Sequence, residues 1–409
     1  MHPASVNIDG FGPLPLARPA TVAELGDLVR GASAERPIYP CGGQTQLGLG
    51  RTPTVPGTAV DLRGLDRVVD FPARDMTITV EAGITIAKLQ TLIAAENLRL
   101  PIDVPNSDRA TLGGILATNV SGSRRFGYGT LRDYVIGISA INDDGNEFKA
   151  GGRVVKNVAG YDLCKLLVGS LGTIGVISQV TLKLRPLAEE QAILRLPCEA
   201  GKLGALLDRL AISRTRPVIL DVVNRDGAKR LTINDATPSA ATERFVLVGY
   251  EGNADAVKWQ VQQLVKELGG SFAVEACVGY TSKPLDLAMS EWPASPDAKL
   301  TLKASLLPSA TADFVSHVES LGSAPALRAH AGNGIVLGHY AGEVSLASAR
   351  DLVAGWRKGA AAVVVVRCPT DWKPELNVWG PPPTDIDAMR EVKKRFDPRG
   401  VFNPGRFVV

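Results

Sequence analysis

Three clusters of glycine and small polar residues stand in the first half of the chain, at residues 41–46, 111–122 and 169–175. The first follows an apolar stretch, and the third leads directly into one. A diphosphate needs several backbone N–H groups directed at it from close range, and glycine leaves room for that approach. Each cluster alone is also compatible with a tight turn or close backbone packing. Three together favour a ligand that carries phosphate groups.

Two common nucleotide-binding motifs are absent from this half of the chain. The first strand–helix junction lacks the GxGxxG fingerprint, and no Walker lysine motif is present. The clusters therefore predict neither a Rossmann fold nor a P-loop.

Hydrophobic periodicity predicts short strands and helices up to Arg185-Pro186, where we place a domain boundary. Thr21 and Glu24 form a capping-box pattern before the first helix, and Asp144-Gly145 supplies a hairpin turn. The predicted elements are helix 22–30, strand 37–40, strand 77–80, a helix around 86–93, hairpin 135–149 and strand 174–184. Residues 111–122 look too irregular for a simple amphipathic helix.

The second half has a different pattern. Residues 299–367 follow the order β-α-β-β-α-β, which is the ferredoxin-like unit, and residues 192–278 give nearly the same order. The clearest helix there covers residues 256–268. Two such units are expected to pair into one broad antiparallel sheet.

Five segments, taken in order, carry a resemblance to a known superfamily: residues 41–46, 105–122, 152–163, 169–177 and 396–406. They resemble the FAD-binding proteins of the vanillyl-alcohol-oxidase and p-cresol-methylhydroxylase (PCMH) type. Within that superfamily the chain is most similar to glycolate oxidase FAD-binding subunits, in particular the smaller flavin subunit.

The resemblance implies an α+β protein with three parts. Residues 1–186 would form a PCMH-type FAD-binding domain of two α/β subdomains, with FAD extended between them. Residues 187–370 would form a ferredoxin-like α+β cap domain over the isoalloxazine ring, and residues 371–409 would return to the FAD domain. Some relatives attach FAD through a histidine. This chain has none between His2 and His317, so non-covalent FAD is expected even though Cys41 lies nearby.

By the same resemblance, the first cluster would contact the pyrophosphate, the second would line the flavin and ribityl chain, and the third would close the site. The cofactor-binding residues so implied are Cys41, Gly42, Gly43, Gln44, Thr45, Gln46, Pro105, Ser107, Thr111, Leu112, Gly113, Gly114, Ala117, Thr118, Ser121, Gly122, Gly169, Gly172, Thr173 and Ile177.

One departure from the family bears on catalysis. Larger relatives carry the stretch His-Ala-Gly-Asp-Gly-Asn-Leu-His, whose two histidines help to bind a divalent metal. The corresponding run here is residues 330–337, in which the first His is His330 and the second is replaced by Leu337. A single imidazole is a poor metal site, so no metal is expected, although His339 lies on the same face of the strand as Leu337. His330 is the candidate catalytic residue, or else an ordinary polar residue of the strand.

Three functions remain open. The first is a subunit that binds FAD and works with a larger flavin subunit and an iron–sulfur subunit to oxidise a small 2-hydroxy acid such as glycolate. The second is a self-sufficient FAD-dependent 2-hydroxy-acid dehydrogenase, for which the cationic candidates for the substrate carboxylate are Arg153, Lys156, Arg185, His330 and Lys373. The third is a structural subunit that has lost its cofactor.

Composition limits the partners and the compartment. The net charge of +3, from 45 basic and 42 acidic residues, argues against nucleic acid. The longest apolar run, residues 360–366, is far shorter than a membrane span and reads as a buried strand. Five cysteines without paired spacing indicate a reducing cytoplasm. The complex that the resemblance implies would allow peripheral contact with the inner membrane. Tryptophans in the proline-rich stretch 369–383 indicate either a partner surface or core packing.

Overall fold

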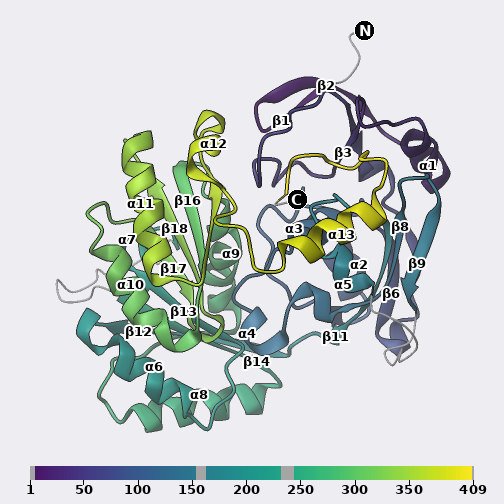
Figure 1. Ribbon diagram of the computed structural model, residues 1–409. Helices are drawn as coiled ribbons and strands as arrows, with labels where there is room; N and C mark the ends of the chain where they lie inside the picture. The colour runs from purple at the N-terminus through teal and green to yellow at the C-terminus, as the bar shows by residue number, and fades with distance from the viewer. Residues whose placement is uncertain (1–4, 153–162, 232–243, 408–409) are drawn as a thin grey trace. The chain divides into compact units, whose positions relative to one another are not determined.

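A computed structural model describes residues 5–152, 163–231 and 244–407 (Figure 1). The chain divides into two compact units. The first contains the described residues up to Val120, those of Thr130–Pro186, and those from Pro381 onward. The second contains Ser121–Gly129 and the described residues of Leu187–Gly380.

These limits differ from the predicted ones at two places. Residues 121–129 belong to the second unit, because Gly127 N donates to Val218 O (3.2 Å) and Arg124 pairs with Glu251 (2.7 Å). The second unit also continues to Gly380 rather than ending at 370. Its core includes Trp372, Leu376 and Val378. Arg153 and Lys156, with the rest of the 153–162 motif, lie outside the described residues.

The first unit is built on three sheets. A four-stranded sheet has the order β1-β2-β4-β3, in which β2 and β3 are both parallel to β4. A five-stranded antiparallel sheet has the order β5-β6-β10-β8-β9, and β7 pairs with β11. The strands are β1 (Ser5–Ile8), β2 (Phe11–Ala17), β3 (Ile38–Cys41), β4 (Thr58–Asp61), β5 (Val68–Asp70), β6 (Thr77–Glu81), β7 (Leu98–Arg99), β8 (Val135–Ile141), β9 (Glu147–Gly151), β10 (Val176–Lys183) and β11 (Arg185–Pro186).

Three helices of this unit, α1, α2 and α3, begin at a threonine whose side chain caps them. In α1, the Thr21 hydroxyl accepts from Glu24 N (3.2 Å), while the Glu24 carboxylate accepts from Ala20 N (2.9 Å). Leu25 and Val29 of α1 pack into a core with strands β3, β4, β8 and β10. The helices are α1 (Val22–Arg30), α2 (Ile86–Ala94), α3 (Leu112–Thr118), α5 (Cys164–Leu167) and α13 (Ile386–Phe396).

The second unit contains one eight-stranded sheet, visible edge-on in Figure 1, with the order β15-β12-β14-β13-β17-β18-β16-β19. Each half has the strand order of a ferredoxin-like unit, and the halves join where β13 pairs with β17. The predicted pairing of two such units is confirmed. The strands are β12 (Glu190–Cys198), β13 (Ile219–Asn224), β14 (Arg244–Gly252), β15 (Glu275–Val278), β16 (Ala298–Ser305), β17 (Ala326–His330), β18 (Ile335–Ala341) and β19 (Ala362–Arg367).

The long helices α6, α8, α10 and α11 cover one face of this sheet, because alternate strand residues and their apolar stripes form a single core. The opposite face packs against α7, α9 and Trp292 in a smaller core. The helices are α4 (Arg125–Tyr128), α6 (Leu203–Ala211), α7 (Arg225–Lys229), α8 (Ala254–Leu268), α9 (Lys283–Glu291), α10 (Thr311–Glu319), α11 (Leu346–Gly359) and α12 (Lys373–Leu376).

Two local predictions were wrong. Residues 360–366 do not form a buried strand, since β19 is an edge strand with alternating burial. Residues 112–118 form helix α3 despite their glycines. No helix among the described residues is long and apolar enough to cross a membrane.

Candidate functional site

The loop that follows β3 lines a cavity of about 90 Å³ in the first unit, which we call the loop cavity. The parallel pairing of β3 with β4 ends at Cys41, so the backbone leaves the sheet there. Of the predicted cofactor residues, those lining the cavity are Cys41, Gly42, Gly43, Gln44, Thr45, Gln46, Thr111, Gly114, Ala117 and Thr118. Two of the three glycine clusters thus meet at one place.

The loop offers several backbone donors. Among the described residues, none of the backbone N–H groups of residues 42–46 donates a hydrogen bond to a protein acceptor. Gln44 has a left-handed backbone (φ +60°), the conformation found within an anion-binding nest. Consecutive unpaired amides around a bend are the usual form of an anion-binding nest.

The glycines of the loop are required by packing as well as by the cavity. A Cβ on Gly42 would lie 2.0 Å from Thr111 Oγ1, and one on Gly43 would lie 1.7 Å from Arg109 O. The Arg109 guanidinium also donates to Gly43 O (3.2 Å). The loop therefore lies directly against residues 109–111, and any side chain at 42 or 43 would separate the two walls of the cavity.

Helix α3 forms the wall opposite the loop. The Thr111 hydroxyl caps it by accepting from Gly114 N (3.3 Å), and Asn119 ends it in a left-handed conformation. The two adjacent glycines of α3, Gly113 and Gly114, have different surroundings. A Cβ on Gly113 would meet Ala82 at 3.0 Å, whereas one on Gly114 would meet only Thr111 Oγ1 at 3.1 Å, on the side that lines the cavity.

The third cluster reaches the cavity through a residue that was not predicted. Leu171 lines it, in a left-handed backbone (φ +53°) held by a hydrogen bond from its N–H to Ala117 O (2.9 Å). Gly172 makes the turn that follows (φ +64°). Gly169 and Thr173 instead line a separate groove of about 330 Å³ beside α13.

The remaining predicted cofactor residues do not line the loop cavity. Leu112 and Gly113 face the core behind α3, and Ile177 lies buried in β10. Pro105 and Ser107 form the turn before α3, whose Ser107 O accepts from Ala87 N (2.9 Å). Ser121 and Gly122 belong to the second unit.

Two residues of the C-terminal segment complete the cavity. Asn403 donates to Leu171 O (2.6 Å), and the Arg406 guanidinium donates to the carbonyls of Leu47 (2.5 Å), Leu49 (2.7 Å) and Arg51 (2.5 Å). Arg406 is only 5% exposed; burial lowers its pKa, while Asp9 and Tyr39 act in the opposite direction. Both residues lie in the closing motif 396–406, so that motif was the available signal.

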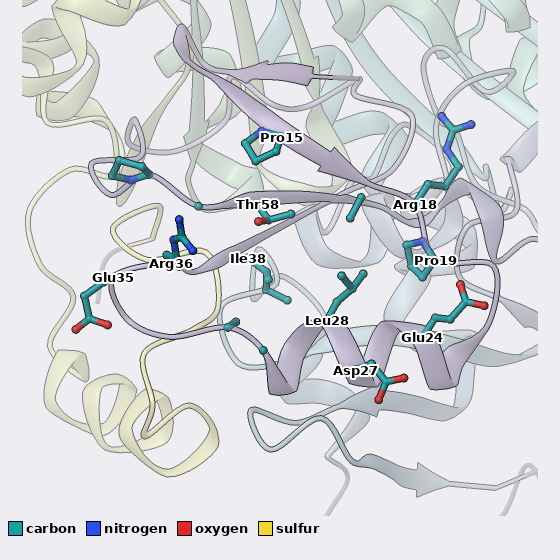
Figure 2. Close-up of a pocket in the computed structure, with 15 residues that line it drawn as sticks. Pro15, Arg18, Pro19, Glu24, Asp27, Leu28, Glu35, Arg36, Ile38 and Thr58 are labelled. Atoms are coloured by element: carbon teal, nitrogen blue, oxygen red, sulfur yellow. The ribbon is translucent and has the colours of Figure 1, made fainter. Parts of the chain in front are cut away.

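The larger hollow shown in Figure 2 is a less suitable anion site. It measures about 940 Å³ and is lined by α1, by the loop after α1 and by residues of strands β2, β3 and β4. Arg18 and Arg36 are outnumbered there by Glu24, Asp27 and Glu35. A hydrogen bond with Ser33 lowers the pKa of Glu35, which therefore remains an anion at neutral pH.

The candidate catalytic residue, His330, ends β17 in the second unit. Its Nδ1 lies 2.7 Å from Asp221 Oδ1, and its Nε2 is buried without a partner among the described residues. His339 is paired with Ala326, four residues from His330 along β17, which separates the two histidines by roughly 13 Å. They cannot share a metal ion. No cluster of metal-ligating residues occurs in the described ranges.

The other cationic candidates are engaged elsewhere. Arg185 interacts with the hydroxyl of Tyr134, and Lys373 is 5% exposed within the second unit.

Leu337, at the position of the missing histidine, lies in register between Arg328 on β17 and Lys303 on β16. Two flanking cations would oppose a metal ion there.

Comparisons with known proteins agree with this geometry. A family model described as "FAD binding domain" matches residues 13–151, and one described as "FAD linked oxidases, C-terminal domain" matches residues 381–407. The chain is 26% identical to the D-lactate dehydrogenase of Archaeoglobus fulgidus, over 96% of this chain and 91% of that protein. It is 29% identical to the glycolate oxidase subunit GlcE of Escherichia coli, over 64% of this chain and 73% of that protein. Among solved structures, alkyldihydroxyacetonephosphate synthase has the same fold (TM-score 0.65, 17% identity, covering 99% of this chain and 81% of that one).

Proposed function

The chain belongs to the FAD-linked oxidases of the vanillyl-alcohol-oxidase and p-cresol-methylhydroxylase type, and from this we propose that its loop cavity holds the diphosphate of a non-covalent FAD used to oxidise a small 2-hydroxy acid. The observation that carries the proposal is the set of unpaired backbone amides at residues 42–46, which belong to a loop that lines the cavity together with α3. A volume of about 90 Å³ suits one section of the cofactor, since whole-ligand pockets measure roughly 300 Å³ or more.

In this proposal each wall of the cavity has a separate role. The amides of residues 42–46 would donate to the phosphate oxygens, and Arg406 would hold the far side of the loop through its three carbonyl contacts. Gly114, Ala117 and Thr118 present small side chains along α3, where the cofactor would pass. Thr118 Oγ1 donates to Gly114 O (2.8 Å), so its methyl group is left to line the cavity.

The surroundings of Cys41, a thiol that lines the loop cavity, support non-covalent attachment. Its thiol is 4% exposed and donates to Val60 O (3.5 Å). Burial and, secondarily, the charge of Asp61 raise its pKa to about 12. The reactive thiolate is therefore scarce at neutral pH, and Cys41 is not expected to form a bond to the flavin.

The substrate class follows from the relatives, which act on D-lactate and glycolate by their names. Bound FAD supplies a two-electron acceptor, and the protein positions and tunes it. We propose that the chain acts as one subunit of a complex, because GlcE is by its name a glycolate oxidase subunit. The partners in this proposal are a larger flavin subunit and an iron–sulfur subunit, as the family resemblance implies. The likeness to a D-lactate dehydrogenase along nearly its whole length favours the second candidate, a self-sufficient dehydrogenase.

An absorption spectrum of the chain purified alone tests the cofactor and separates the two candidates. We expect flavin bands that acid precipitation releases into solution. Bleaching of these bands by anaerobic glycolate or D-lactate would identify a self-sufficient dehydrogenase. Flavin that stays oxidised until the partner subunits are added would identify a complex. A chain without flavin bands, even after incubation with FAD, would overturn the proposal.

A further inference from the structure

The two ferredoxin-like halves of the second unit leave a groove where they join. The groove measures about 760 Å³, and all its lining residues belong to the second unit. Two of its walls are α6 and α10, each of which is the first α-helix of its half (Figure 1). These helices approach each other at Gly204 and Ala312, since a Cβ on Gly204 would lie 4.0 Å from the Cβ of Ala312. We call the space beside this contact the helix groove.

The floor of the helix groove is part of the apolar core. Leu220 of β13 and Ala331 line the groove and also belong to the core beneath the long helices. Phe126 lines it as well and packs closely on Gly332, where an added Cβ would lie 2.1 Å from the Phe126 ring. The layer of long helices is therefore incomplete at the join, and the core can be reached from solvent there. Contiguous apolar surface of this kind usually marks a binding site.

The chain exposes two large apolar side chains at the edges of the helix groove. Ile212, directly after α6, is 84% exposed, and Leu307, which precedes α10, is 73% exposed. Their neighbours in sequence, Ala211 and Pro308, line the groove. A small molecule held among the lining residues would leave Ile212 and Leu307 in water. A protein segment can cover the groove and both side chains together, so the helix groove fits a protein partner better than a small ligand.

Arg216 indicates the charge of that partner. It lines the helix groove, and its Nη1 donates to the carbonyls of Ser213 (3.3 Å) and Thr215 (3.1 Å). The other side-chain nitrogens of Arg216 donate to no acceptor among the described residues. Arg209 and Arg214, on the same side of the groove, likewise form no ion pair within the described part of the chain. A guanidinium held in place with N–H groups to spare is well suited to bind a carboxylate.

Fewer acidic groups lie on this side of the groove. Asp208 of α6 lines it. The Glu267 carboxylate of α8 is already occupied, because it accepts from Ser213 Oγ (2.6 Å), Gln263 Nε2 (2.7 Å) and Arg214 N (3.2 Å). Three guanidinium groups therefore stand against two carboxylates, and an acidic partner complements that excess.

We propose that the helix groove receives an amphipathic segment of a partner subunit, with an apolar face over Ile212 and Leu307 and a carboxylate that pairs with Arg216. The inference rests on the complex in the proposed function and names the surface through which this chain joins it. Apolar anchors laid into a groove, with charges beside them, are a common mode of peptide recognition.

The probes are the larger flavin subunit and the iron–sulfur subunit, each purified alone and titrated calorimetrically with this chain. We expect one of them to bind the unmodified protein. Ile212→Ser and Leu307→Ser should each weaken that binding about tenfold. Arg216→Gln should weaken it about as much and reduce its dependence on salt, whereas Asp208→Asn should not weaken it.

Leu287→Ser is the matched control. Leu287 is 64% exposed on α9, which packs on the opposite face of the sheet from the helix groove. This variant should bind the partner subunit as tightly as the unmodified protein. Because Ile212, Leu307 and Leu287 are all exposed, the three serine variants should keep the melting temperature and the FAD content of the unmodified protein.

The outcomes distinguish the two proposals. If neither subunit binds the unmodified protein, the proposed complex fails and this inference fails with it, while the flavin spectrum still decides the cofactor and the substrate. If one subunit binds the unmodified protein and the Ile212, Leu307 and Arg216 variants equally, only the inference fails. A chain that dimerises alone, and that Ile212→Ser makes monomeric, would place a second copy in the helix groove and overturn the inference.

Discussion

Gly113 and Gly114 are adjacent, yet their surroundings predict opposite consequences for the same substitution. A Cβ at Gly113 would be forced against Ala82 at 3.0 Å, whereas one at Gly114 would enter the cavity side of α3. We expect Gly113→Ala to lower the melting temperature of the cofactor-free protein. Gly114→Ala should leave it unchanged or raise it, since alanine favours a helix by about 0.5–1 kcal/mol, but should weaken FAD binding. Thermal melts and flavin-fluorescence titrations of both variants check this pair, and equal FAD affinity in Gly114→Ala would place the cofactor elsewhere.

Substitutions at Arg406 and Arg399 test whether the closing motif, residues 396–406, shapes the loop cavity or only stabilises the first unit. Both arginines donate to backbone carbonyls, Arg406 to those of the cavity loop and Arg399 to those of Asp143, Arg30 and Ala32. Removing either leaves part-buried carbonyls without this donor, so each change to Met should cost about 2–4 kcal/mol of stability. Only Arg406→Met should also reduce FAD affinity, by about tenfold. If Arg399→Met weakens FAD equally, the effect is global rather than local.

At the scale of the element, Asn224 links the two halves of the large sheet. Its side-chain oxygen accepts from Gly227 N (2.8 Å) and Leu327 N (2.9 Å), and its amide donates to Pro325 O (2.9 Å). Asn224→Ala would leave these buried groups unpaired and should cost about 3 kcal/mol in urea unfolding. Asn253→Ala, which removes the exposed cap of α8, is the control and should cost about 1 kcal/mol. Similar losses in the two variants would mean that the join is not held by Asn224.

The elements that could be predicted are those whose pattern is local. The Thr21 cap of α1 and the Asp144-Gly145 turn both act within a few residues, and each appears where it was expected. Helix α3 was missed because its glycines have low helix propensity, which the docking of Leu112 and Gly113 on the chain around Ala82 outweighs. The place of residues 121–129 depends on Arg124 meeting Glu251, more than a hundred positions away. Contacts between residues so far apart in the sequence cannot be predicted from hydrophobic periodicity.

The site was predictable only in part for the same reason. Glycine clusters 41–46 and 111–122 identified two walls of the cavity, because a close backbone approach requires a glycine wherever it occurs. Arg406 and Asn403 reach the cavity from the far end of the chain, through hydrogen bonds to Leu47 and Leu171. Asp221 was missed entirely, since only the register of β13 with β17 brings it to His330.

At the scale of the whole molecule, the two units should respond differently to acid. His339 is 1% exposed against Trp292, and burial lowers its pKa to about 4. The pKa of His339 is therefore lower in the folded state than in the unfolded state. Between pH 6.5 and pH 4 the unfolded chain binds a proton that the folded chain does not bind. The stability of the second unit should be complete above pH 6.5 and fall by about 3 kcal/mol as the pH drops to 4. Below that pH, protonation of Asp221, whose pKa is also lowered, continues the loss.

Urea unfolding at pH 7, 6 and 5 measures this loss, and tryptophan fluorescence confines it to one unit. All five tryptophans lie between residues 259 and 379, so the signal reports the second unit alone. His339→Gln keeps an amide for Thr301, the present partner of His339 Nδ1 (2.9 Å), but removes the proton-binding group. We expect this variant to be less stable at pH 7 through imperfect packing, and to lose much less stability than the unmodified protein between pH 7 and 5. Parallel losses in the two proteins would show that another group controls the acid response, whereas a flat profile in the variant alone would assign it to the imidazole beside Trp292.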